Sequence, residues 1–213
     1  MAQSLISPTC VPPLPPGKPL RLGVMASGSG SNFEAIVAAI AAQRLHAQVR
    51  VMICNNPKAR VFERADRWHI PAVLHNHRQV PSREALDTQI VQTLHDHQVE
   101  CVIMAGWMRI VTPVLIHAFP NAILNIHPSL LPSFKGIHAV EQALAAGVKI
   151  AGCTVHRVVP AVDSGEILAQ AAVPVMPEDT PETLQARIHL QEHRIYPQAI
   201  ASIIPEFRPT PSA

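Results

Sequence analysis

The stretch "CVIMAGW", residues 101–107, carries apolar side chains on both faces of the strand that it would form. Such a strand is typical of a parallel sheet, because helices cover both faces of that kind of sheet. Strand and helix signals alternate around this run in the order β-α-β-α-β-α-β. The order predicts one α/β domain with a doubly wound, mostly parallel, Rossmann-like sheet and right-handed crossovers.

Further strand and helix signals surround this run. Short apolar runs predict strands over residues 20–27, 49–56, 70–75, 122–127, 150–159 and 166–175. Helical periodicity predicts helices over residues 32–45, 59–69, 82–97 and 180–204. We expect the last helix to bend before Pro197, because a proline inside a helix removes a backbone hydrogen bond.

The composition is that of a well-buried α/β chain. Of its 213 residues, 48% are apolar and 15% are charged, which argues against a disordered protein. The net charge is only +2 and there is no run of Lys and Arg, so we expect no nucleic-acid partner. No apolar run approaches the ~20 residues of a membrane span, so we expect no membrane partner.

The two ends of the chain differ in composition from the middle. Residues 1–19 hold six of the 21 prolines and no acidic residue, which predicts a disordered, proline-rich extension. They lack the apolar region of a secretory signal, while an organellar targeting peptide stays open. The folded domain is expected over residues 20–204, followed by a flexible tail over residues 205–213. Deletion of residues 2–18 should therefore leave the fold and the activity intact.

Cysteine and histidine usage gives no metal signature. The four cysteines stand far apart without a C-x-x-C pair, so we expect reduced, structural thiols in a cytoplasmic protein. Among the twelve histidines, the close pairs His75/His77 and His95/His97 lack accompanying acidic or cysteine ligands. We therefore expect no structural or catalytic metal.

The stretch "SGSGSN", residues 27–32, follows a strand and opens a helix. Gly28 and Gly30 allow a close approach of the backbone, and free amides at a helix N-terminus favour an anion such as phosphate. The stretch is not a Walker A loop, and Phe33 replaces the third glycine of a dinucleotide motif. These features favour a small phosphate over a dinucleotide, with a plain glycine-rich turn as the alternative.

The stretch "LNIHPSLLPSF", residues 124–134, ends a strand on polar side chains. Asn125 and His127 stand at i and i+2, so they point to the same side of a strand. Asn can donate to an oxyanion, and His can act as an acid, a base or a cation. The alternative is an Asn-His pair that satisfies the turn formed around Pro128 and Pro132.

Asp163 lies in the stretch "HRVVPAVDSGE", residues 156–166, just before a Ser-Gly turn between two expected strands. A carboxylate on such a turn commonly caps the turn or faces solvent. The residues alone therefore assign no chemistry to Asp163.

Seven motifs, in their order along the chain, carry a family resemblance. They are "SGSGSN", "NNP", "SREALD", "AGWMRIV", "NIHPSLLPSFKGIHA", "VHRVVPAVDSGEIL" and "LQEHRIYP". Over about residues 20–204 the chain resembles the phosphoribosylglycinamide formyltransferases of purine synthesis. The resemblance implies transfer of a formyl group from the co-substrate 10-formyltetrahydrofolate to the amino group of glycinamide ribonucleotide. The products would be formylglycinamide ribonucleotide and tetrahydrofolate.

The resemblance also implies roles for individual residues. The catalytic residues would be Asn125 and His127, which stabilise a tetrahedral oxyanion, and Asp163, which favours the imidazolium form of His127. The ribonucleotide would be bound by Gly30, Ser31, Asn32 and Glu192. The folate would be bound by Arg83, Met108, Arg109, Ile110, Val111, Val159, Pro160, Ala161, Val162 and Asp163.

Three other functions share part of this pattern. A 10-formyltetrahydrofolate hydrolase uses the same trio but usually carries an N-terminal regulatory domain, for which 19 residues are too few. A formyltransferase acting on methionyl-tRNA or a sugar nucleotide needs an extra domain or a basic face. A non-catalytic binding module would not need all of Asn125, His127 and Asp163. The sequence leaves the oligomeric state open between a monomer and a weak homodimer.

Overall fold

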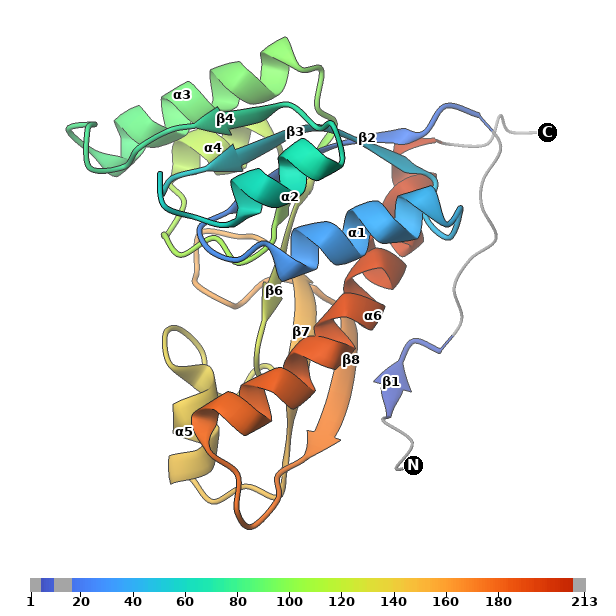
Figure 1. Ribbon diagram of the computed structural model, residues 1–213, viewed down its shortest axis with the longest axis vertical. Helices are drawn as coiled ribbons and strands as arrows, with labels where there is room; N and C mark the ends of the chain where they lie inside the picture. The colour runs from blue at the N-terminus through green and yellow to red at the C-terminus, as the bar shows by residue number, and fades with distance from the viewer. Residues whose placement is uncertain (1–4, 10–16, 209–213) are drawn as a thin grey trace.

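The computed structural model describes residues 5–9 and 17–208, and its strands form one continuous sheet (Figure 1). The strands are β1 (Ile6–Ser7), β2 (Leu20–Ala26), β3 (Ala47–Cys54), β4 (Ala72–Leu74), β5 (Cys101–Met104), β6 (Ile123–His127), β7 (Ile150–Arg157) and β8 (Ile167–Pro174). The helices are α1 (Ser31–Ala41), α2 (Val61–Arg67), α3 (Arg83–Asp96), α4 (Pro113–Ala118), α5 (Ala139–Ala145) and α6 (Pro181–Phe207).

The sheet order is β1-β8-β7-β6-β5-β2-β3-β4. The five strands from β2 to β6 pair in parallel, whereas β7, β8 and β1 pair antiparallel. The predicted α/β fold with a mostly parallel sheet is therefore confirmed. The short helices α4 and α5 were not predicted, because helical periodicity is hard to recognise in segments shorter than about 11 residues.

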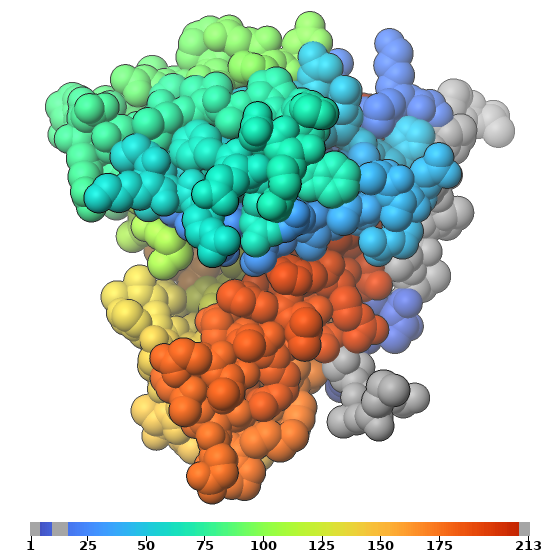
Figure 2. Space-filling model, viewed as in Figure 1, coloured from blue at the N-terminus to red at the C-terminus, as the bar shows by residue number. Residues whose placement is uncertain are grey.

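Strand β5 explains why this sheet is covered on both faces. Cys101 and Ile103 belong to the apolar cluster that includes α1 and α6, which lie side by side on one face (Figures 1 and 2). Val102 and Met104 belong to the second cluster, with α3 and α4 on the other face. Because all four side chains are buried, truncating Ile103 to alanine would remove about 2–5 kcal/mol of stability.

Helix α6 crosses one face of the sheet and is anchored at the strand ends (Figure 1). It runs as one 27-residue helix through Pro197 and Pro205, so Pro197 does not end it. The hydroxyl of the fully buried Tyr196 lies 3.1 Å from the carbonyl oxygens of both Met104 and Leu124. This contact holds the middle of α6 against the last residue of β5 and the second residue of β6. No helix in the described part of the chain is long and apolar enough to cross a membrane.

Part of the N-terminal segment that was expected to be disordered, residues 5–9 and 17–19, lies within the described residues. Ile6 and Ser7 pair with β8, and the N–H of Ala172 donates to the carbonyl of Leu5 at 2.9 Å. The free edge of β8 supplies unpaired backbone groups, which explains the pairing. The rest of the expected disordered region, residues 1–4 and 10–16, lies outside the described residues.

The C-terminal segment that was expected to be flexible is described as far as Arg208. Helix α6 continues to Phe207, and the guanidinium of Arg208 binds both carboxylate oxygens of Glu100 at 3.0 and 2.7 Å. The same guanidinium donates to the carbonyls of Lys18 and Pro19 at 3.1 Å. Hydrogen bonds from Arg208 therefore hold the end of α6 to the start of β2. Residues 209–213 lie outside the described part.

Candidate active site

The candidate site lies where neighbouring parallel strands end. Met25 of β2 pairs with Met104 of β5, which in turn pairs with Asn125 of β6. The loop after β2, the segment after β5 and the end of β6 are therefore neighbours. Parallel α/β sheets bind ligands at this edge, where the strand ends leave a crevice.

The carboxylate of Asp163 joins two histidines at this edge. Its Oδ2 lies 3.4 Å from Nδ1 of His127, and its Oδ1 lies 3.5 Å from Nε2 of His156. The side chains of Asp163 and His127 are 9% and 7% exposed. The carboxylate is thus not the solvated turn residue that the sequence alone suggested.

The local structure explains how Asp163 keeps its charge. Burial alone would raise the pKa of this carboxyl, but the hydrogen bond with His156, the amide of Gly136 and the charges of His127 and His156 hold the pKa below its ordinary value. The Gly136 N–H donates to Oδ2 at 2.8 Å. Asp163 has a left-handed φ of 47°, which Asp tolerates better than most residues.

Both ring nitrogens of His127 face acceptors. Nε2 lies 2.8 Å from the carbonyl oxygen of Phe134, and Nδ1 faces the carboxylate of Asp163. Only the doubly protonated imidazolium can donate to both of these groups. The loop that contains Pro128 and Pro132 therefore brings the Phe134 carbonyl back to the histidine ring.

Nε2 of His156 lies near both Asn125 and Asp163, and it can form a hydrogen bond with only one of them at a time. Its Nδ1 donates to the carbonyl of Arg157 at 2.8 Å, so Nε2 of the neutral ring accepts a hydrogen from the Asn125 side-chain amide at 3.2 Å. A protonated ring would instead donate from Nε2 to Asp163. One amide hydrogen of Asn125 is used in the neutral arrangement, and the second remains available to a ligand.

The glycine-rich loop has a conformation that excludes side chains at one position. Gly30 has a φ of +75°, and a Cβ atom there would lie 2.4 Å from Cγ2 of Val61. Ser31 and Asn32 follow as the first residues of α1. The first amides of a helix have no partner within the helix, so they can bind an anion.

Helix α6 reaches this loop through one buried hydrogen bond. Nδ2 of Asn32 donates to Oε2 of Glu192 at 2.8 Å. Burial raises the pKa of the Glu192 carboxyl, although Asn32, His189 and His127 act in the opposite direction. Oε2 of Glu192 also lies 3.8 Å from Nε2 of His189, one turn earlier on α6.

The residues expected on the folate side form two segments with exposed apolar side chains. Met108 and Ile110 are 76% and 56% exposed, while Val111 is buried; Val159 and Val162 are also exposed. Arg109 has a buried Nε without a hydrogen-bond partner among the described residues, which leaves a donor for a ligand. The remaining members of the expected set, Arg83, Pro160 and Ala161, are exposed.

These two segments begin from the same part of the core. Trp107 and Val111 pack in one apolar cluster, and Val158 packs against that cluster. Arg83 starts α3, and Asp87, one turn later, accepts a hydrogen bond from the backbone of Thr112 at 2.6 Å. No group of three or more His, Cys, Asp or Glu side chains within residues 5–9 and 17–208 could hold a metal ion.

Comparison with known proteins shows the family. Residues 20–200 match the family model described as formyl transferase. The chain is 43% identical over 184 residues to the phosphoribosylglycinamide formyltransferase of Bacillus subtilis (strain 168), across 86% of this chain and 94% of that protein. The chain belongs to the phosphoribosylglycinamide formyltransferase family.

Solved structures of phosphoribosylglycinamide formyltransferases have the same fold. Glycinamide ribonucleotide transformylase 1 from Symbiobacterium toebii has a TM-score of 0.87 and 47% identity, with 91% of each chain covered. Phosphoribosylglycinamide formyltransferase from Bacillus halodurans has a TM-score of 0.84 and 43% identity, with 86% of this chain and 95% of that chain covered. The resemblance stated from the motifs is therefore confirmed.

Sequence reasoning missed one residue of this formyltransferase site. His156 begins the motif in which Asp163 was recognised, yet it was given no role. The available signal was strand pairing, because β7 runs antiparallel to β6 and places His156 opposite Asn125. Only the register between the two strands makes that pairing evident.

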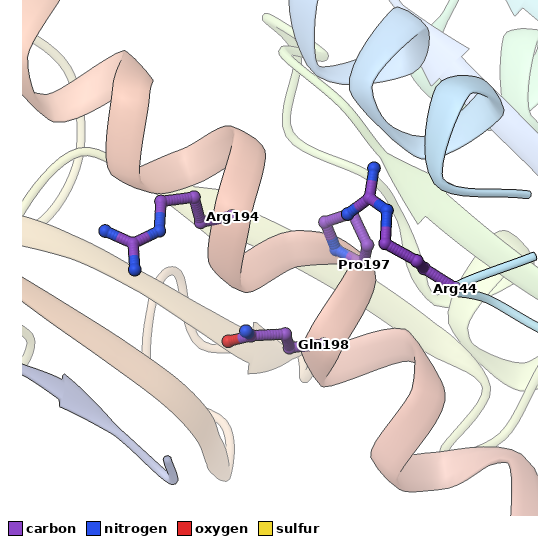
Figure 3. A pocket seen from close by; sticks show the side chains of 4 residues that line it. All are labelled: Arg44, Arg194, Pro197 and Gln198. Carbon is purple, nitrogen blue, oxygen red and sulfur yellow. The ribbon is translucent and has the colours of Figure 1, made fainter. Parts of the chain in front are cut away.

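A separate surface depression lies between α6 and the turn that follows α1 (Figure 3). Its lining residues are Arg44, Arg194, Pro197 and Gln198. None of them belongs to the loop, the histidine cluster or the exposed apolar segments. We therefore place the candidate site of this formyltransferase at the strand ends.

Proposed function

We propose that this formyltransferase transfers the formyl group of 10-formyltetrahydrofolate to the amino group of glycinamide ribonucleotide, as a step of purine biosynthesis. The observation that carries the proposal is the buried hydrogen bond from Asn32, at the start of α1, to Glu192. It joins a phosphate-type loop to a buried acid. A water nucleophile would require neither of them.

The ribonucleotide is proposed to bind along this line of residues. The backbone amides at Gly30, Ser31 and Asn32 hold the phosphate at the start of α1, where the helix dipole favours an anion. Glu192 holds the glycinamide end through its charge. The loop is held in place because the Val61 N–H donates to the Gly28 carbonyl at 3.2 Å and Nε of Arg64 donates to the Ser29 carbonyl at 2.7 Å. The bound phosphate would therefore set the distance of the amine from the histidines.

The folate is proposed to bind along the exposed apolar side chains on the segments at residues 108–111 and 159–162. Apolar rings bind well to such surfaces, and exposed apolar patches commonly mark ligand sites. Arg109 and Arg83 supply positive charge for the anionic end of the folate. Asp163 ends the second segment, so the formyl group would lie next to the carboxylate.

The proposed reaction is a nucleophilic acyl transfer. The amine nitrogen attacks the formyl carbon, a C–N bond forms, and the carbonyl electron pair moves onto the oxygen. The amine loses one proton to Asp163, directly or through one water. Collapse of the intermediate breaks the bond to N10, which takes up that proton as tetrahydrofolate leaves.

Asn125 and His127 are proposed to stabilise the oxyanion together. The free amide hydrogen of Asn125 donates to the developing negative oxygen, and the imidazolium of His127 adds a nearby positive charge. A preorganised donor of this kind lowers the barrier by roughly 3–4 kcal/mol. Asp163 stabilises the imidazolium, and the neutral ring of His156 holds the Asn125 amide in position through Nε2.

The acceptor is tested by following tetrahydrofolate and formate with and without glycinamide ribonucleotide. We expect tetrahydrofolate to form only when the ribonucleotide is present, with one formylated product for each tetrahydrofolate. Release of formate at the same rate without the ribonucleotide would instead assign a hydrolase. Asn125→Ala serves as the inactive control.

The remaining properties follow the same proposal. The donor acts as a co-substrate, no metal takes part, and the partners are the two small molecules. We propose the cytoplasm as the location, because Cys54, Cys101 and Cys153 are buried free thiols of the kind maintained in a reducing compartment.

A further inference from the structure

Ser27, the first residue after β2, contacts the segment after β5 with both its backbone and its side chain. Its N–H donates to the carbonyl of Gly106 at 3.0 Å, and its Oγ accepts the N–H of Met108 at 2.9 Å. From the other side, the side-chain amide of Asn56 donates to the Ser27 carbonyl at 3.4 Å. The segment at residues 106–108 thus forms hydrogen bonds with both the backbone and the hydroxyl of Ser27, and Asn56 forms one with its carbonyl.

The contact through the hydroxyl differs in kind from the backbone contacts. The bond from Ser27 N–H to Gly106 continues the ladder between β2 and β5, in which Ala105 N–H donates to Met25 at 2.8 Å. Any residue except proline at position 27 could make that bond. The bond to Met108 needs a hydroxyl group, and it links two segments that are 81 positions apart.

The segment from Gly106 to Thr112 is therefore fastened at both ends. Ser27 holds the first end to the glycine-rich loop, and Asp87, which is 2% exposed, holds the second end to α3 through the Thr112 amide. The exposed side chains of Met108 and Ile110 lie between the two fastenings. Only the first fastening connects this segment to the loop proposed to hold phosphate.

We propose that the Ser27 hydroxyl is a positioning group that couples the ribonucleotide and folate sites. This inference rests on the proposed function, in which residues 30–32 hold the phosphate and residues 108–111 hold the folate. A ligand that orders the loop also orders Ser27, and through it the backbone of Met108. The second ligand then binds a segment that is already ordered, and linkage makes the effect reciprocal.

The test uses tetrahydrofolate, which carries no formyl group and so forms a dead-end complex with glycinamide ribonucleotide. Its affinity is measured by titration calorimetry with and without saturating ribonucleotide. We expect the ribonucleotide to tighten tetrahydrofolate binding by about fivefold or more in the wild-type protein. Ser27→Ala should abolish this ratio while leaving the affinity for ribonucleotide alone largely unchanged. Ser27→Thr, which keeps a hydroxyl, should restore the ratio.

Asp87→Asn provides the matched control, because it weakens the other fastening of the same segment. It should reduce tetrahydrofolate affinity equally with and without ribonucleotide, so the ratio stays at the wild-type value. Loss of the ratio in this variant would overturn the specific assignment to Ser27, as would a wild-type ratio in Ser27→Ala.

Hydrogen exchange of the Met108 amide tests the coupling between the two sites in the wild-type protein, without any variant. Ribonucleotide alone should slow exchange of the Met108 N–H in the wild-type protein, and unchanged exchange would overturn the coupling even if Ser27→Ala did not fold. Formyl transfer to the ribonucleotide separates the two claims. An absence of transfer contradicts the proposed function, whereas transfer without coupling contradicts only this inference.

Discussion

Asn32 donates a hydrogen bond of 2.8 Å from Nδ2 to Oε2 of Glu192, across 160 positions of the chain. Both side chains are buried, with 7% and 3% of their surface exposed. The bond joins the first turn of α1 to the middle of α6, and burial raises the pKa of the Glu192 carboxyl. A buried acid at this place reduces stability at neutral pH, and ligand binding gives a reason to retain it.

Glu192→Gln should therefore stabilise the free protein and weaken the ribonucleotide. A raised pKa makes its stabilising contribution greatest below the ordinary value of 4.5, and that contribution is lost as pH rises through the raised value. Glutamine still accepts the Asn32 bond but has no charge to bury. At about pH 7 we expect a melting temperature higher by roughly 2–4 °C per kcal/mol gained, and no gain at about pH 4. Ribonucleotide affinity should fall at about pH 7, where the variant lacks the charge for the glycinamide end, and a variant that is less stable at neutral pH would contradict this reasoning.

The glycine loop offers a matched pair of substitutions. A Cβ atom at Gly30 would meet Val61 at 2.4 Å in a left-handed backbone conformation, whereas a Cβ atom at Gly28 has no atom within 4 Å. Gly30→Val should weaken ribonucleotide binding far more than folate binding and lower stability by about 1 kcal/mol or more. Gly28→Ala should leave stability unchanged. Titration measures the affinity for each of the two ligands. Equal losses of affinity for ribonucleotide and folate in folded Gly30→Val would refute a dedicated phosphate loop.

The charge of Asp163 should be visible in the stability of the protein. Its pKa is lowered, so its stabilising contribution is present above the ordinary value of 3.8 and is lost as pH falls through the lower folded value. Wild type should be more stable than Asp163→Asn at about pH 7, and the difference should disappear at lower pH as the carboxylate is protonated. Denaturant unfolding of both proteins at a series of pH values measures this difference in stability. A difference that persists unchanged through full protonation would point to packing rather than charge.

The short strand at the N-terminus modifies the expectation for truncation. Deletion of residues 2–9 removes Ile6 and Ser7 from the edge of β8, so we expect a melting temperature lower by a few degrees and unchanged turnover. The exposed edge should also increase self-association, because unpaired strand edges pair with other chains. Light scattering and turnover check both expectations. A large loss of turnover would show that β1 supports the site.

The sheet and the shared direction of Asn125 and His127 could be predicted because their signals are local. The run from Cys101 to Trp107 is apolar on both faces, which requires helices on both sides, and both helical layers are present. Asn125 and His127 are two positions apart on one strand, so their shared direction follows from strand geometry. Asp163 needed the family resemblance, since nothing local distinguishes it from a solvated turn residue.

The rest depends on contacts between distant parts of the chain. The role of His156 follows from its register opposite Asn125, and the position of Glu192 follows from its bond to Asn32. The ordering of Ile6 depends on a free strand edge that only the assembled sheet provides. Composition and periodicity report none of these, because they describe neighbours along the sequence rather than neighbours in space.

The central claim is that His127 and Asp163 act as one unit in formyl transfer. The most direct test is the single-turnover rate of transfer to glycinamide ribonucleotide in His127→Ala, Asp163→Ala and the double variant. Each single variant should lose most of the rate while binding the ribonucleotide nearly as well as wild type, because the pair acts on charge that develops in the transition state. The double variant should be little slower than the slower single variant, as for residues that act together. Losses that simply multiply would contradict the account.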